Sequence, residues 1–114
     1  MENTTNENAL SIALELRRGV IILAVLSQLE EEQYGYSLLK LLSDQGLELD
    51  QGTLYPLLRR LEGQGLLQSD WRIVDDARPR RYYQISPQGS STLTLLKQEW
   101  LSIVATLNQM LLDK

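Results

Sequence analysis

The spacing of apolar residues changes at Gly65 from the period of a helix to the alternation of a strand. Before Gly65, leucines recur three and four residues apart and share one helical face: Leu54, Leu57, Leu58 and Leu61. After it, every second residue falls on the same side of a strand: Leu67, Ser69, Trp71 and Ile73. Residues 81–85 return as a partner strand beyond a charged turn at residues 75–79. The sequence therefore predicts a helix that runs directly into a β-hairpin.

Two further helices are predicted before this unit. The first covers residues 10–29 or 14–29, and the residues expected on its core side are Leu16, Val20, Leu23 and Leu26. The second covers residues 36–44. Asp50 is suited to cap the third helix, which we expect to begin at Gln51, with Gly65 as its C-terminal glycine. Three helices and a hairpin are the order of a winged helix-turn-helix, so the predicted fold class is mainly α with a small β-hairpin.

A long helix is predicted after the strand-breaking residues 86–89. Its apolar residues are spaced three and four apart, which is typical of a coiled-coil seam: Leu93, Leu96, Trp100, Ile103, Leu107 and Met110. A second apolar stripe contains Leu101, Val104, Ala105 and Leu111. Because one small domain covers only one such stripe, we expect a homodimer. The predicted organisation is a flexible arm at residues 1–8, a winged-helix domain at 9–86 and a C-terminal dimerisation helix at 87–114.

The amino-acid composition argues against an enzyme. The chain of 114 residues has Cys 0 and His 0, so it lacks disulfides, thiolate and imidazole metal ligands, a cysteine nucleophile and a Ser-His-Asp triad. No acid pair or glycine-rich phosphate loop remains for catalysis, and we expect no metal and no cofactor. The longest apolar run, residues 20–26, is far shorter than the roughly 18 residues of a membrane span. We therefore expect a cytoplasmic binding protein.

The charge of the chain is unevenly distributed. Its net charge is −4, which by itself argues against a nucleic-acid partner. Residues 50–86, however, hold six arginines and five acids and so carry +1, while the remaining residues carry −5. A local basic hairpin on an acidic body can still bind a polyanion.

Four motifs stand out at a fixed spacing: Tyr34-Gly35-Tyr36, GTLYPLLRRLEGQGLL at residues 52–67, RRYYQIS at residues 80–86, and Gly89. Together they resemble the PadR family of bacterial transcriptional regulators. Ser86 stands where the family commonly has Thr. The chain ends after one C-terminal helix, as in short-tailed members, whose dimer is built from that helix and the first helix. Its shortness is also similar to the cyanobacterial clock-associated Pex branch, although no single residue distinguishes that branch.

Candidate DNA-binding residues come from both the pattern and the resemblance. The resemblance implies that Thr53 and Tyr55 face DNA and that Tyr36 lies beside the DNA backbone. Gln51 and Arg59 would supply an amide and a guanidinium group on the exposed side of the third helix. Such groups suit base edges and phosphates. The hairpin adds three crowded arginines that would attract an anion: Arg78, Arg80 and Arg81.

Each candidate has a structural alternative. Tyr36 and Tyr55 could be packing residues, and Arg59 could pair with Glu62 or Asp50. The hairpin arginines could be neutralised by the nearby Asp75 and Asp76. Trp100 lies in the middle of the predicted seam. In multidrug-responsive proteins that the sequence resembles, an aromatic residue at such a place stacks on planar ligands, which makes a small planar effector a candidate partner; the alternative is interface core.

The sequence thus predicts a transcriptional repressor that binds double-stranded DNA at an inverted-repeat operator as a homodimer. The alternative is a winged-helix module that binds other proteins and not DNA, which the acidic composition favours. Salt dependence separates the two hypotheses, because only DNA binding releases condensed counterions.

Overall fold

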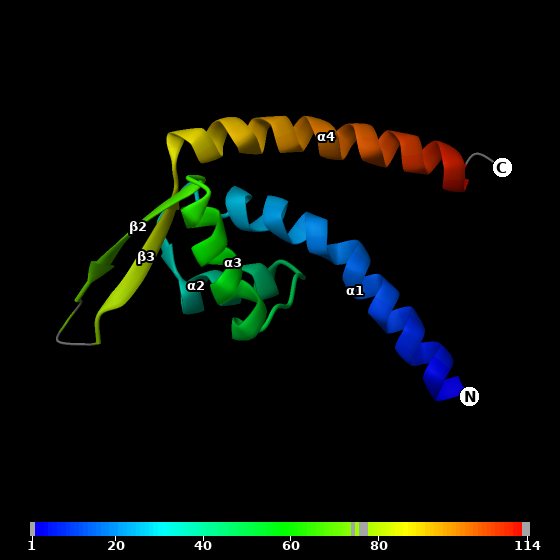
Figure 1. The fold of residues 1–114 in the computed structure, drawn as a ribbon, viewed down its shortest axis with the longest axis horizontal. Coiled ribbons are helices and arrows are strands. Elements are labelled where there is room, and N and C mark those ends of the chain that lie inside the picture. Colours follow the sequence, from blue (N-terminus) through cyan, green and yellow to red (C-terminus); the bar gives the residue numbers. More distant parts are fainter. Residues whose placement is uncertain (1, 74, 76–77, 113–114) are drawn as a thin grey trace.

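The computed structural model describes residues 2–73, 75 and 78–112 and gives the side chains from Asn6 onward. Over these residues the chain forms four helices and three strands (Figure 1). In order they are α1 (Glu2–Ser27), β1 (Gln33–Tyr34), α2 (Gly35–Asp44), α3 (Gln51–Gly63), β2 (Leu67–Arg72), β3 (Arg80–Ile85) and α4 (Pro87–Leu112). The predicted mainly α fold, with a winged helix-turn-helix and a long C-terminal helix, is confirmed.

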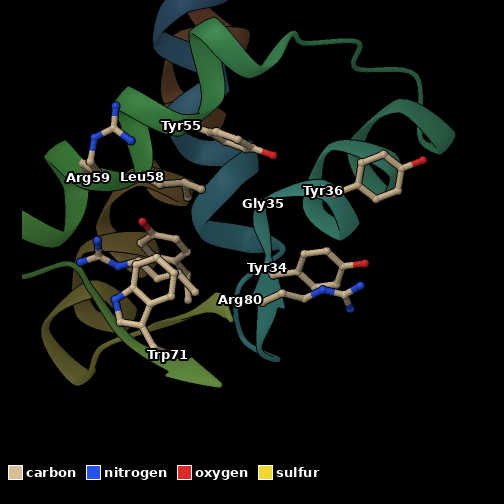
Figure 2. A pocket seen from close by; sticks show the side chains of 10 residues that line it. Tyr34, Gly35, Tyr36, Tyr55, Leu58, Arg59, Trp71 and Arg80 are labelled. Carbon is tan, nitrogen blue, oxygen red and sulfur yellow. The ribbon is translucent and has the colours of Figure 1, made fainter. Parts of the chain in front are cut away.

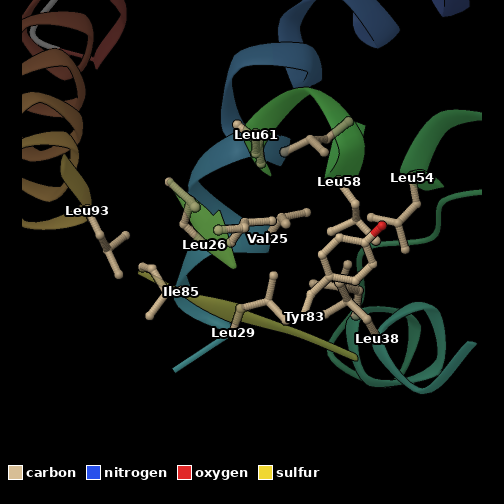
Figure 3. Packing of buried hydrophobic residues seen from close by; sticks show 13 residues of the cluster. Val25, Leu26, Leu29, Leu38, Leu54, Leu58, Leu61, Tyr83, Ile85 and Leu93 are labelled. Carbon is tan, nitrogen blue, oxygen red and sulfur yellow. The ribbon is translucent and has the colours of Figure 1, made fainter. Parts of the chain in front are cut away.

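The hydrophobic core lies where α1, α2 and α3 meet the sheet and the start of α4 (Figure 3). The leucines predicted on the buried side of α3 are correct for three of the four, since Leu54, Leu58 and Leu61 are fully buried and Leu57 is half-buried. The complete buried set is Ile21, Val25, Leu26, Leu29, Leu38, Leu42, Leu54, Leu58, Leu61, Leu67, Tyr83, Ile85 and Leu93. One core therefore joins α1, α2, α3, the sheet and the start of α4.

The sheet has one strand more than the predicted hairpin. Its order is β1-β3-β2, and both pairs are antiparallel. Tyr34 of β1 faces Tyr82 of β3 in register, and their rings contact edge to face with centroids 5.6 Å apart. A strand of two residues is too short to show alternation, so sequence spacing could not predict it.

The first helix differs from its prediction in extent and in its buried side. α1 begins at Glu2, so residues 2–8 are helical and not the predicted flexible arm. Once a helix is nucleated, each added residue gains a backbone hydrogen bond, and this segment has no Pro or Gly before Gly19 to stop it. Leu16, predicted to face the core, is 76% exposed. This part of α1 extends beyond the globular head, which is formed by the C-terminal part of α1, by α2 and α3, and by the sheet (Figure 1).

The predicted signals at the ends of α3 are confirmed. Asp50 has extended backbone, and its carboxylate accepts the Thr53 N–H at 2.7 Å, which caps the helix. At the other end, Gly65 adopts a left-handed φ of 81°, and the Leu66 N–H reaches back to the Leu61 carbonyl at 3.0 Å. These two ends fix the position of α3 between the loop from α2 and the hairpin.

The start of α4 is held by a junction formed by Gly65, Leu66, Ser86 and Gly89, which we call the Ser86 junction. The Ser86 hydroxyl donates to the Gly65 carbonyl at 2.6 Å and accepts the Gly89 N–H at 2.9 Å. The Ser86 N–H also donates to the Leu66 carbonyl at 3.0 Å. Because α4 begins here against the head, Leu93 is only 3% exposed and lies in the core, so its predicted place in a dimer seam is wrong.

We expect Gly89→Ala to destabilise the fold. A Cβ at this position would lie 2.0 Å from the Leu66 carbonyl oxygen, a backbone atom that cannot move without breaking the Ser86 junction. Overpacking of this kind lowers the free energy of unfolding by about 1–3 kcal/mol, which urea denaturation followed by circular dichroism would measure. Gly63→Ala is the control, because nothing lies within 4 Å of its Cβ. Equal stability of the two variants would contradict the view that the Leu66 carbonyl leaves no room for a side chain at Gly89.

Candidate nucleic-acid interface

The outer face of α3 is polar and exposed. Its buried side is formed by leucines, so the residues left outside are Gln51, Gly52, Thr53, Pro56, Arg59 and Arg60. Two guanidinium groups, an amide and a hydroxyl therefore lie on one surface of a helix that is anchored at both ends. These groups are donors that suit phosphate oxygens and the acceptor edges of bases.

The arginines of this face are not neutralised within the head. Asp50 uses its carboxylate to cap α3, and Glu62 pairs with Arg81 at 2.6 Å. The expected alternative, an ion pair from Arg59 to Asp50 or Glu62, is not formed. Across the described part of the chain, no carboxylate pairs with Arg59 or Arg60. The surface of α3 is therefore locally positive on a chain whose net charge is −4.

Arg81 is turned inward, unlike the rest of the basic hairpin. Its guanidinium donates to Ser69 at 3.0 Å as well as to Glu62, and it lies 5.5 Å from the ring centroid of Tyr83. Burial raises the pKa of this tyrosine above its ordinary value. The charge of Arg81 is thus neutralised by Glu62. This placement does not support Arg81 as a free DNA contact.

Arg80 and Arg78 remain exposed on the hairpin. The Arg80 guanidinium lies 4.4 Å from the ring centroid of Tyr34, which orients it without neutralising its charge. Arg72, on the neighbouring strand, forms ion pairs with Glu32 and Asp70. The alternative that Asp76 neutralises the hairpin lies outside the described residues. Arg80 is therefore an exposed hairpin arginine whose guanidinium is oriented by a contact with Tyr34 and has no carboxylate partner among the described residues.

A hollow of about 390 Å³ separates α3 from the start of α2 and the hairpin (Figure 2). The structure brings several predicted residues together around it, namely Tyr36, Tyr55, Arg59, Arg80 and Arg81. Three others lie elsewhere. Gln51 and Arg78 do not line this hollow, and Thr53 faces the opposite flank of α3, beside α1.

The two tyrosines predicted here differ in role. Tyr55 is half-buried and packs against the core, and a Cβ on Gly35 would lie only 2.4 Å from its Cε1 atom. Its ring therefore fits against glycine backbone at the start of α2, as Figure 2 shows. Tyr36 is 60% exposed, so the packing alternative does not describe it. The DNA contacts of both residues remain predictions.

The remaining seam residues lie along a groove between α1 and α4. Leu16, Val20 and Leu23 of α1 face Leu96, Trp100, Ile103 and Leu107 of α4 across about 580 Å³. Trp100 is 42% exposed and Ile103 47%, and Met110 is exposed farther along α4. The two helices diverge toward the chain termini in Figure 1, which leaves these apolar side chains without cover in one copy of the chain.

Metal binding and membrane crossing have no support in the described segments. They hold no group of three or more acidic, His or Cys residues placed to bind a metal ion. None of their helices combines the length and apolarity that a bilayer crossing requires.

One basic residue beside α3 was not predicted from the sequence. Arg18 of α1 lines the opposite flank of α3, together with Thr53. Its only sequence signal is the pair Arg17-Arg18 within an otherwise acidic N-terminal part. Helical spacing alone does not indicate which of these two arginines faces α3.

Comparison with known proteins gives consistent matches. The family model described as "Transcriptional regulator PadR-like family" matches residues 22–95. The transcriptional regulator Rv3488 of Mycobacterium tuberculosis is 42% identical over 81 residues, which are 70% of this chain and 75% of that protein. A PadR family transcriptional regulator from Eggerthella lenta superposes with a TM-score of 0.89 at 40% identity, covering 97% of this chain and 98% of that one.

The circadian clock associated protein Pex from Anabaena is also similar. It superposes with a TM-score of 0.60 at 26% identity and covers 76% of this chain and 79% of its own. Both values are lower than those of the Eggerthella protein. Membership of the Pex branch therefore stays a prediction.

We expect Arg81 to matter for stability. Arg81→Met would remove the cation that pairs with the half-buried Glu62 carboxylate and leave it only the Ser69 hydroxyl, which lowers the free energy of unfolding by about 1–3 kcal/mol. Arg80→Met, at an exposed position on the same strand, should change it by less than about 0.5 kcal/mol. A double-mutant cycle of Arg81→Met with Glu62→Gln, followed by urea denaturation, should show favourable coupling. Additive losses would mean that the ion pair contributes nothing.

Proposed function

The chain belongs to the transcriptional regulator PadR-like family, and we propose that it is a repressor that binds an inverted-repeat operator in double-stranded DNA as a homodimer. The observation that carries the proposal is the exposed face of α3, where Arg59 and Arg60 have no partner carboxylate in the described part of the chain. The chain carries no cysteine and no histidine, and its proposed action is occupancy of DNA. Such a partner would place the protein in the cytoplasm.

The proposed binding mode follows from the shape of the head. α3 enters the major groove, where Gln51 and Arg59 are available to read base edges and Thr53 and Tyr55 to contact the sugar-phosphate backbone. The hairpin projects from the head in Figure 1 and would bring Arg78 and Arg80 to adjacent phosphates. Tyr36, exposed at the start of α2, would lie against the same DNA strand as these phosphates.

The proposed dimer accounts for the uncovered apolar side chains of α1 and α4. Burial of Trp100, Ile103, Leu107 and Met110 against a second copy would remove them from water. A twofold-symmetric dimer presents two copies of α3 in inverted orientation, which requires an inverted repeat in the operator. The groove that holds Trp100 also supports a small planar effector as a further proposal, since its ring is half-exposed beside apolar neighbours.

Salt dependence and base preference test the proposal against the protein-binding alternative. Sites selected from a random duplex library would be titrated at increasing salt, and the logarithm of affinity should fall steeply with the logarithm of salt. Arg59→Gln should weaken the selected site by about 1–3 kcal/mol and random DNA by less. Arg80→Gln should weaken both and lower the salt slope by about 0.9 for each phosphate that Arg80 neutralises. Lys97→Gln on α4 is the control for the change in net charge. DNA binding that does not depend on salt would favour the alternative, a winged-helix module that binds other proteins.

Sedimentation tests the dimer. Ile103→Asp with Leu107→Asp places two charges where the proposed partner would pack, so we expect a folded monomer whose helix content is retained. Leu96 is left unchanged because it packs against the protomer core. Gln98→Asp adds a charge at an exposed position on the same helix and should leave the dimer intact. A dimer that survives both aspartates would contradict the proposed interface.

A further inference from the structure

The flank of α3 that faces away from the hairpin borders a second hollow, which we call the α1–α3 crevice. It has a volume of about 530 Å³ and lies between the middle of α1 and the outer side of α3. It is lined by Arg18 and Ile22 of α1 and by Thr53, Pro56, Leu57 and Arg60 of α3, among others. Two helices far apart in sequence thus bring two guanidinium groups and a hydroxyl to one place.

The crevice is positive on an acidic chain. No carboxylate lines it among the described residues, and neither Arg18 nor Arg60 takes part in an ion pair there. Glu15, one turn before Arg18 on α1, is exposed and does not pair with it. Three hydrogen-bonding side chains without a carboxylate partner are suited to an anion and not to a basic segment of another protein.

The dimensions of DNA indicate which anion it is. An α-helix with its side chains is about 10–12 Å wide, close to the roughly 12 Å width of the major groove. A helix that enters this groove therefore has phosphates of one strand along one flank and phosphates of the other strand along the opposite flank. In the proposed complex the hairpin, with Arg80, contacts the phosphates along the first flank. The second flank of α3 is the one that forms the crevice.

We propose that Arg18, together with Arg60 and Thr53, binds phosphates of the DNA strand opposite to the one that the hairpin contacts. The inference rests on the proposed function, because it needs α3 in the major groove. It adds α1 to the DNA interface, whose other contacts all come from α2, α3 and the hairpin.

Arg17 supplies a matched control. It is exposed like Arg18 and adjacent in sequence, but it lines the groove between α1 and α4, on the same side as Glu99 and Trp100. Removal of either arginine changes the net charge of the chain by the same amount. Only Arg18 should matter for a phosphate contact beside α3.

The test measures affinity for a selected duplex as a function of salt by fluorescence anisotropy. For a dimer with two such contacts, Arg18→Gln should lower the salt slope by about 1.8, or about 0.9 per contact. Arg18→Lys should restore the slope, because the charge and reach are kept. Arg17→Gln should leave it unchanged. Circular dichroism and sedimentation of each variant establish that fold and dimer are intact.

The outcomes are distinct. A wild-type protein without salt-dependent DNA binding would overturn the proposed function and this inference with it. A wild-type protein that binds, and an Arg18→Gln variant with the same slope, would overturn the inference alone. Equal reductions for Arg17→Gln and Arg18→Gln would also overturn it, since they would reflect net charge and not a contact.

Discussion

The Ser86 junction determines how α3 and α4 are oriented relative to each other. One hydroxyl donates to the carbonyl of Gly65, just beyond α3, and accepts the N–H of Gly89, in the first turn of α4. Gly89 has no Cβ, so the backbone of α4 approaches the Leu66 carbonyl closely. The direction in which α4 leaves the head is therefore tied to the end of α3. In a dimer built through α4, this connection would also set the angle between two recognition helices.

The charges of the head follow one arrangement. Carboxylates near the candidate interface already have partners: Asp50 caps α3, Glu62 holds Arg81, and Glu32 and Asp70 hold Arg72. Among the arginines that remain exposed, Arg59 and Arg60 lie on α3, Arg18 lies beside it, and Arg78 and Arg80 lie on the hairpin. An acidic protein can in this way present a positive surface only where DNA would fit, while its remaining acids repel the duplex elsewhere. Net charge alone is a poor guide to the partner of such a chain.

Spacing and turn chemistry predicted the parts of the fold whose structure is decided locally. Helix α3, its Asp50 cap and the left-handed Gly65 follow from residues within one segment, as does the pairing of β2 with β3. Apart from residues 2–8, which are helical, the differences from prediction concern contacts between distant segments. Leu93 continues the periodic seam but is buried by the Ser86 junction, and Arg81 belongs to a basic run but meets Glu62 across 19 residues. Two-residue β1 and the position of Arg18 beside α3 are likewise set by tertiary packing alone.

We propose that two copies of α3, related by a twofold axis, read one operator. Protection mapping of bound DNA at single-nucleotide resolution tests it most directly. We expect two protected regions with inverted sequences, centred about 10 bp apart or a multiple of that distance. Their flanks should be protected on both strands, as contacts on both sides of α3 require. A single protected region without inverted symmetry, bound by one copy of the chain, would contradict it.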